Sequence, residues 1–114
     1  MIKEITLNGG RQLKLAANAA TPFRFKQIFG GDLLRMMQHT ANDDQDAESV
    51  DDYISKLAFI MNRQAEQIDL NTISEIDFYN WLEDFEPMDF VFAGADIIHV
   101  YVSTTNSSVE PKKN

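Results

Sequence analysis

The sequence predicts an α+β fold, in which a short N-terminal β-hairpin precedes a mostly α-helical body of four to five helices. Three observations support this class. Apolar and polar residues alternate on both sides of Asn8-Gly9-Gly10, which is typical of two strands joined by a tight turn. From residue 21 onward, apolar residues recur at spacings of three and four, the period of a helix. Ser, Pro and Gly residues stand between these periodic segments, where helices start and stop.

The register of the hairpin follows from the two faces of its strands. Directly opposed residues of an antiparallel pair lie on the same face. A two-residue loop would place Ile5 opposite Gln12 and mix the faces, whereas a three-residue loop places Ile5 opposite Leu13 and keeps Leu7 and Leu15 on that face. We therefore expect a three-residue loop. A lone hairpin is only marginally stable, so its apolar face must pack on the helices or on a strand of another subunit.

The segment from residue 21 to residue 38 predicts two helical pieces with a break between them. Thr21 and Pro22 are typical of a helix start, because Thr can cap free N–H groups and Pro lacks its own. A pair of glycines interrupts the run, and Asp32 can cap the second piece. The apolar side of the segment either faces the core or also binds a partner, since Met adapts to irregular apolar surfaces. This side consists of Phe25, Ile28, Phe29, Leu33, Met36 and Met37.

An acidic stretch, residues 40–49, predicts a solvent-exposed loop rather than a metal site. Its carboxylates alternate as calcium ligands do, so both registers of a calcium loop need testing. Counting from Asn42 puts Ala47 where the loop requires Gly, and counting from Asp44 puts Ser55 where it requires a bidentate Glu. Both registers fail, and we expect no calcium site.

The next helix is expected to begin at Ser49 as N-cap and to carry an apolar stripe from Val50 to Ile68. Phe59 points almost opposite to the centre of that stripe. The helix is therefore either central and buried on two sides, or Phe59 is an exposed contact residue for another chain.

A third helical region begins at Asn71 or Ser74 and ends before Pro87, which disfavours helix for the residue that precedes it. One face of this region carries large apolar side chains, which are those of Phe78, Trp81, Leu82 and Phe85.

The last segment runs from Met88 to about Ser103. Residues 97–102 are β-branched and aromatic and so resemble a strand, but the spacing of the whole segment favours a helix, which we expect. The domain prediction is a single domain over residues 1–104, with the hairpin at 2–16 and the helical body at 21–104. Residues 105–114 are expected to form a disordered polar tail.

Charge is distributed unevenly along the chain. Residues 1–40 carry six Lys and Arg against two carboxylates, whereas residues 41–110 carry sixteen carboxylates against Lys56 and Arg63. An acidic body opposes binding to nucleic acid, which depends on neutralising phosphates, so we expect no nucleic-acid partner. The asymmetry allows self-association, with the basic end of one copy on the acidic end of another.

Composition and motifs argue against catalysis. There is no cysteine, which excludes disulfides, thiolate zinc sites and cysteine nucleophiles. His39 and His99 lack a second ligand at metal-site spacing, and no nucleotide-binding or hydrolase motif occurs. No apolar run approaches the ~20 residues of a membrane span, and the start is not a signal peptide. We expect an intracellular soluble protein that is not an enzyme, with no catalytic residue, metal, cofactor or membrane partner.

The whole pattern resembles tail assembly chaperones of long-tailed, siphovirus-type phages and prophages. The resemblance is carried by a hairpin leading to TPFRFKQIFGGDLL, residues 21–34, and by the ending STTNSSVEPKKN. It implies a non-enzymatic protein of the bacterial host cytoplasm that binds the tape-measure protein, keeps it soluble and helps recruit tail-tube subunits. Such a chaperone is absent from the mature virion. These families often make a longer form by ribosomal frameshifting, and we expect a slippery adenine run in the codons for residues 112–114.

The expected binding site is an apolar groove for amphipathic helices of the client protein. The residues predicted to contact the partner are Phe25, Phe29, Leu33, Met36, Met37, Phe59 and Trp81. Two other classes stay open. An acidic regulator that mimics nucleic acid would use the sixteen carboxylates, although these are divided between a loop and several helices. A structural tail or head-completion subunit would remain in the finished particle, unlike a chaperone.

Overall fold

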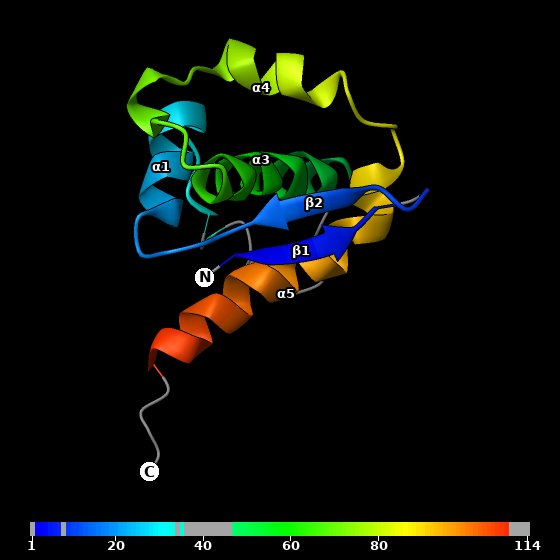
Figure 1. The fold of residues 1–114 in the computed structure, drawn as a ribbon. Coiled ribbons are helices and arrows are strands. Elements are labelled where there is room, and N and C mark those ends of the chain that lie inside the picture. The colour runs from blue at the N-terminus through cyan, green and yellow to red at the C-terminus, as the bar shows by residue number, and fades with distance from the viewer. Residues whose placement is uncertain (1, 8, 34, 36–46, 110–114) are drawn as a thin grey trace.

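The computed structural model describes residues 2–7, 9–33, 35 and 47–109 (Figure 1). In these ranges, a two-stranded antiparallel hairpin is followed by four α-helices and one 3₁₀ turn, which confirms the α+β class. The elements in chain order are β1 (Lys3–Thr6), β2 (Gln12–Leu15), α1 (Thr21–Phe29), α3 (Ala47–Ala65), η1 (Leu70–Thr72), α4 (Glu75–Leu82) and α5 (Asp89–Val109).

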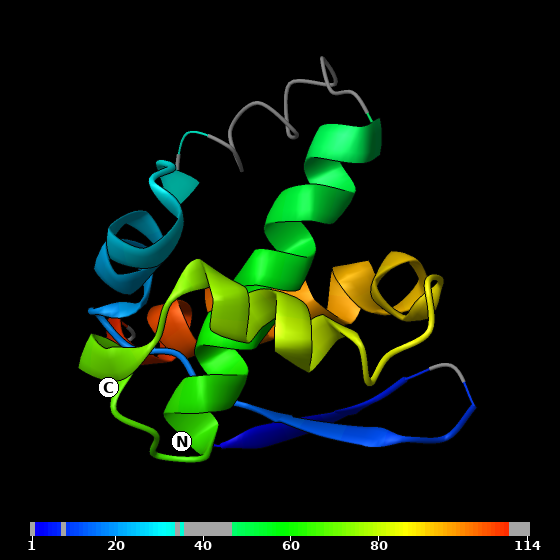
Figure 2. The same ribbon diagram turned by 90° about the horizontal axis from the view of Figure 1, so that it is seen from above.

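Helix α3 is the centre of the molecule. It contacts α1, α4, α5 and β2, and Figures 1 and 2 show α4 crossing over it while the hairpin and α5 lie on its other side. Nearly every side chain from Tyr53 to Asn62 is buried or half-buried, and Phe59 is only 1% exposed. The helix is thus buried on two sides, and the alternative of Phe59 as an exposed contact residue is wrong. The reason is that α4 covers the side of α3 that the apolar stripe leaves free.

The hairpin has the register predicted from its two faces. Lys3 pairs with Leu15 and Ile5 with Leu13, and the Leu7 N–H donates to the Arg11 carbonyl at 2.7 Å. The three-residue loop is confirmed. Its glycines adopt positive φ, 94° and 90°, which non-glycine residues rarely reach.

The apolar face of the hairpin packs on the helices of its own chain. The Ala16 N–H donates to the Met61 carbonyl at 3.0 Å, and the Asn62 side-chain amide donates to the Lys14 carbonyl at 2.9 Å. Both bonds satisfy backbone groups at the outer edge of β2, which α3 therefore covers.

Helix α1 starts where the sequence predicts, but Thr21 does not cap it. The N-cap is Ala20, and the buried Thr21 hydroxyl instead accepts from the Asn18 N–H at 2.9 Å and donates to Gln64 on α3 at 2.7 Å. Burial against α3 makes that tertiary bond available. At the other end Gly30 adopts φ 85° and closes the helix with a bond to Lys26.

Three boundaries differ from the sequence prediction. Helix α3 begins at Ala47, so Ser49 lies inside it rather than capping it. Of the two predicted starts of α4, Ser74 is confirmed and forms a capping box with Asp77, whereas Asn71 lies in η1. Helix α4 ends at Leu82 rather than just before Pro87, so Phe85 lies beyond it. Helix α5 includes residues 97–102, as predicted, but continues to Val109 rather than ending at about Ser103. The acidic loop predicted at residues 40–49 lies outside the described residues up to residue 46, and residues 47–49 belong to α3. Met36, Met37 and His39 also lie outside the described residues.

No helix in the described ranges is long and apolar enough to cross a membrane.

Candidate functional site

The residues predicted to form a partner groove are mostly core residues. Phe25, Leu33 and Phe59 are buried, so they are not available to a partner in this fold. Phe29 and Trp81 are half-buried and belong to the same aromatic cluster: Phe29 lies 5.0 Å from Phe78 and Trp81 lies 5.2 Å from Phe59, between ring centroids. The groove prediction is therefore wrong for the buried residues. Rings that are buried in the core contribute to the stability of every folded molecule. Rings on the surface would be removed from water only while a partner is bound.

A continuous run of exposed side chains, mostly apolar, begins at Met88, just before α5, and follows this helix. The side chains on its outer side follow one another at spacings of four, three, four and three residues, which keeps them on one side of a helix. We call these exposed residues the α5 row: Met88, Phe92, Ala95, His99 and Val102. Phe92 is 65% exposed, an unusual state for a Phe in a folded protein.

The opposite side of α5 fixes the orientation of the row. That side is packed in the core through Phe90, Ala93, Ile97, Val100 and Tyr101. Gly94 permits a close approach to α3, because a Cβ there would lie 3.2 Å from Cδ1 of Ile54. Helix α5 is thus hydrophobic on two sides, of which only one meets the protein.

The start of α5 is held by a capping arrangement. The Asp89 N–H donates to the Glu86 carbonyl at 3.0 Å, and the Glu86 N–H donates to Oδ2 of Asp89 at 2.9 Å. Pro87 stands two residues before the helix, in the turn that leads into it, where its missing N–H costs nothing. Asp89 is only 2% exposed, so this bond is shielded from water and holds Met88 and Phe92 in place on the surface.

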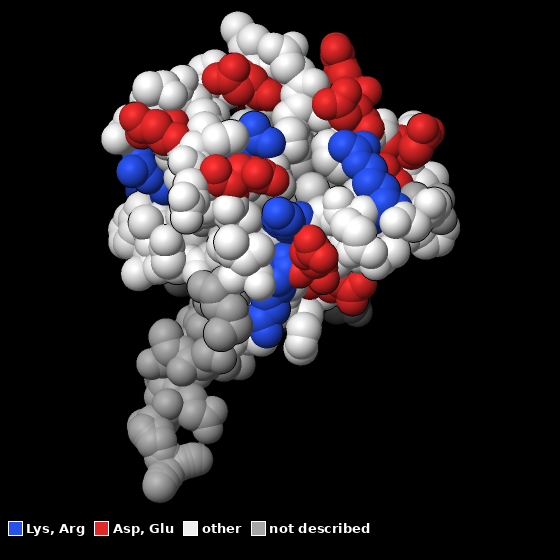
Figure 3. Space-filling model, in the orientation of Figure 1, with Lys and Arg blue, Asp and Glu red and all other residues white. Residues whose placement is uncertain are grey.

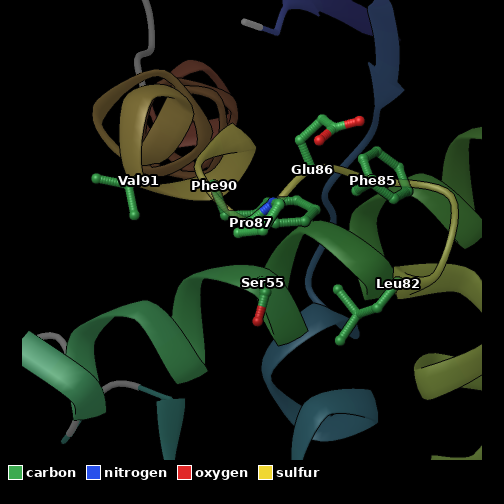
Figure 4. Close-up of a pocket in the computed structure, with 7 residues that line it drawn as sticks. All are labelled: Ser55, Leu82, Phe85, Glu86, Pro87, Phe90 and Val91. Carbon is green, nitrogen blue, oxygen red and sulfur yellow. The ribbon is translucent and has the colours of Figure 1, made fainter.

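A pocket of about 350 Å³ lies beside the α5 row, between α3, the loop after α4 and the start of α5 (Figure 4). Figure 4 shows Glu86 on the rim, with its carboxylate directed away from Ser55 and Leu82. The wall is mostly apolar. We call this cavity the Val91 pocket; its lining residues are Ser55, Leu82, Phe85, Glu86, Pro87, Phe90 and Val91.

The charges near this apolar surface are mostly negative, but Arg11 of the hairpin is a basic neighbour, which donates to the Asp84 carbonyl and lies 4.2 Å from the ring centroid of Phe85. From Glu75 to Ser103, which covers α4 and most of α5, the sequence contains seven carboxylates and no Lys or Arg. Figure 3 shows carboxylates at the top of the molecule, where α4 lies, and carboxylates interspersed with Lys and Arg across its middle. A partner of this surface is expected to be basic.

A second pocket, of about 480 Å³, lies between α3, η1 and α4 around Arg63. Burial lowers the pKa of the Arg63 guanidinium, while the neighbouring carboxylates Glu66 and Asp77 act in the opposite direction. The guanidinium donates to Oδ1 of Asn62 at 2.6 Å and lies 5.6 Å from the Phe59 ring centroid. Both contacts lie within α3, and Asp77 of α4 lies close enough to act on the guanidinium electrostatically. Among the described residues, no group of three or more His, Asp or Glu is placed to hold a metal ion.

Comparison with protein families, curated proteins and solved structures finds no match. The case for a function therefore rests on the surface itself.

Sequence reasoning missed the exposure of Phe92 and Val91. The signal was present: α5 carries two apolar rows, and a helix can bury only one of them where it has neighbours on a single side. Of these two rows, the structure buries the one through Phe90 and Ile97 and exposes the one through Phe92 and Val102.

Proposed function

We propose that the protein is a tail assembly chaperone of a long-tailed phage or prophage. It binds the tape-measure protein, keeps it soluble in the host cytoplasm, helps recruit tail-tube subunits and leaves before the virion is complete. The role involves no catalysis. Two things support it, namely the resemblance of the hairpin and TPFRFKQIFGGDLL segment to that family and the exposed α5 row.

The α5 row is the observation that carries this proposal. Its average spacing of 3.5 residues matches the repeat by which two helices pack side by side. A tape-measure protein is a long helical chain with apolar stripes, so one of its stripes would cover Phe92, Ala95 and Val102. Each square ångström of apolar surface removed from water contributes about 25 cal/mol, and this gain is the same for many sequences.

The composition of the α5 row suits binding to client helices of different sequence. Met88 is flexible and can fit irregular stripes, and Ala95 lets a client helix approach closely at the middle of the row. The exposed carboxylates of α4 and of the loop that follows it oppose aggregation of the loaded complex. The apolar contact between the row and the client is modest, so a tail-tube subunit that competes for the client can release the chaperone.

The test is co-expression of the chain with the tape-measure protein, scoring how much client stays in the soluble fraction and co-purifies. We expect recovery with the wild-type chain and loss with Phe92→Asp, because a buried carboxylate opposes helix docking. The matched control is Ile76→Asp, a substitution at an equally exposed apolar residue of α4, outside the row. Client recovery that is unchanged by Phe92→Asp would reject the α5 row as the binding surface.

A structural tail or head-completion subunit is the alternative that the same experiment separates. It would leave the client insoluble, and the chain would then be found in purified particles by mass spectrometry. A chaperone would be absent from those particles.

A further inference from the structure

The α5 row contains one polar side chain among apolar ones. Met88, Phe92, Ala95 and Val102 are apolar, whereas His99 carries an imidazole, which is exposed. His99 follows Ala95 by four positions and precedes Val102 by three, so it lies within the row and not beside it. A helix that covers the row therefore also covers this imidazole.

Within its own chain, the imidazole of His99 has no hydrogen-bond or ion-pair partner among the described residues. On α5 itself, Asp96 stands one turn before it and is exposed, and the hydroxyl of Ser103, one turn after it, donates to the Val100 carbonyl. Helix α3 and strand β1 also pack against α5. Their described charged side chains, none of which is bonded to His99, are those of Lys3, Glu4, Lys56 and Arg63.

Covering an imidazole with a purely apolar stripe is unfavourable. Every imidazole carries at least one N–H donor, and a donor that is removed from water without an acceptor opposes docking. A helix that brings an acceptor to this point avoids that penalty. One polar residue in an otherwise apolar seam fixes the register between two helices for this reason.

The charge near His99 selects the kind of acceptor. Asp96 is its neighbour on the helix, and the sequence from Glu75 to Ser103 contains seven carboxylates and no Lys or Arg. A carboxylate on the client would be repelled there, whereas an amide or a hydroxyl accepts a hydrogen bond without carrying charge. We propose that His99 determines specificity: the client helix docks in the register that places an Asn, Gln, Ser or Thr of its apolar stripe opposite the imidazole. This role rests on the proposed function, because it needs a client on the α5 row.

The same contact makes docking depend on pH. Imidazoles take up a proton near pH ~6.5 in water, and covering the charged form is unfavourable. Asp96 favours that form only weakly, because it is exposed and one turn away. The client therefore docks on the neutral imidazole, and below about pH 6.5 docking must first release a proton. Affinity is full above that pH and falls up to about tenfold for each pH unit below it.

The probes are three synthetic amphipathic helices of about 28 residues, or four heptads. Each has a stripe of Ala and Leu and a polar side of Lys and Gln, and they differ only at one central stripe position, which is Leu, Asn or Glu. Fluorescence anisotropy of the labelled peptide measures binding to the full chain at about pH 7.5 and 5.5. We expect the wild type to bind the Asn peptide about tenfold tighter than the other two at the higher pH, and about tenfold more weakly at the lower pH.

Two substitutions separate the hydrogen bond from the charge. His99→Leu should reverse the preference, so that the Leu peptide binds tightest, and should remove the dependence on pH. His99→Gln should keep the preference for the Asn peptide but lose the dependence on pH, because an amide does not titrate. His39→Gln, at the other histidine of the chain, is the control and should behave as the wild type does. Because His99 is exposed, its variants should fold, which circular dichroism checks.

Three results would overturn the inference: equal affinity of the wild type for the Leu and Asn peptides, a preference for Asn that survives in His99→Leu, or equal affinity for the Asn peptide at both pH values. Each of these leaves the proposed function standing, because the row still binds a helix. A wild type that binds no peptide, or a Phe92→Asp chain that binds all three as the wild type does, would reject the α5 row and the role of His99 together.

Discussion

The side-chain oxygen of Asn62 on α3 accepts a hydrogen bond from the indole N–H of Trp81 on α4, with 3.2 Å between Oδ1 and Nε1. The same oxygen accepts from Arg63 at 2.6 Å, and the amide of Asn62 donates to the Lys14 carbonyl of β2 at 2.9 Å. Asn62 is only 4% exposed. One buried amide therefore connects the hairpin, the central helix and α4.

Replacing this amide should destabilise the whole domain. Asn62→Ala leaves the Lys14 carbonyl, Trp81 and Arg63 without their partner, and each unsatisfied buried group costs about 1–3 kcal/mol. Because all three are only partly shielded, we expect a loss of about 3 kcal/mol in the free energy of unfolding. Urea unfolding followed by circular dichroism measures it. Trp81→Phe removes one of the bonds together with part of a ring that packs on Phe59, so its loss does not isolate the bond. A loss below about 1 kcal/mol for Asn62→Ala would contradict the role assigned to Asn62.

Phe59 and Phe92 provide a matched test of core against surface. Phe59 packs against Phe29, Phe78 and Trp81, so Phe59→Ala should lower the free energy of unfolding by about 3–5 kcal/mol. Phe92→Ala removes the same atoms from an exposed position and should change it by about 0.5 kcal/mol or less. Chemical denaturation of both variants distinguishes them. A large effect at Phe92 would mean that the α5 row is covered in the free protein.

The features that could be predicted from the sequence are those set by residues close to one another in the chain. The hairpin register follows from alternation, because Ile5 and Leu13 must share a face whatever surrounds them. Ser74 caps α4 through groups within three residues of it. The helix predicted for residues 97–102 is confirmed in spite of their strand-like composition, because the apolar spacing of the longer segment outweighs the strand propensity of a few residues.

What could not be predicted depends on neighbours that are distant in sequence. Phe23 and Phe25 are two positions apart in one helix, yet one is exposed and the other fully buried, because α3 lies on only one side of α1. Phe59 lay outside the main stripe of its helix and became a core residue when α4 covered it. The candidate site failed for this reason: aromatic richness marked the core, and the exposed row on α5 was the weaker of two patterns.

Gly94 and Ile54 form a contact whose strain can be measured. Gly in a helix interior costs about 0.5–1 kcal/mol relative to Ala, so Gly94→Ala should stabilise α5 unless the new methyl group meets resistance. A Cβ would lie 3.2 Å from Cδ1 of Ile54, which is tight. We expect Gly94→Ala alone to change the free energy of unfolding little. In a chain that also carries Ile54→Val, which removes that atom, Gly94→Ala should raise it by up to about 1 kcal/mol. A double-mutant cycle by thermal unfolding checks this. If the effects of the two substitutions on the free energy of unfolding were strictly additive, the new methyl group would not be strained against Ile54.

Tyr101 should make the domain sensitive to alkaline pH. Burial on α5 raises the pKa of its phenol above the ordinary value of 10.0, because desolvation disfavours the anion. The unfolded chain then loses this proton at lower pH than the folded one. The contribution of Tyr101 to the free energy of unfolding is therefore fully present below about pH 10 and is lost as pH rises from there through the folded pKa.

Circular dichroism of urea unfolding at about pH 8 to 11 should show this decline for the wild type and a shallower one for Tyr101→Phe. Tyr79→Phe, at an exposed position of α4, is the matched control and should keep the wild-type decline. If Tyr101→Phe and the wild type declined equally, ionisation of this phenol would not be what unfolds the domain in alkali.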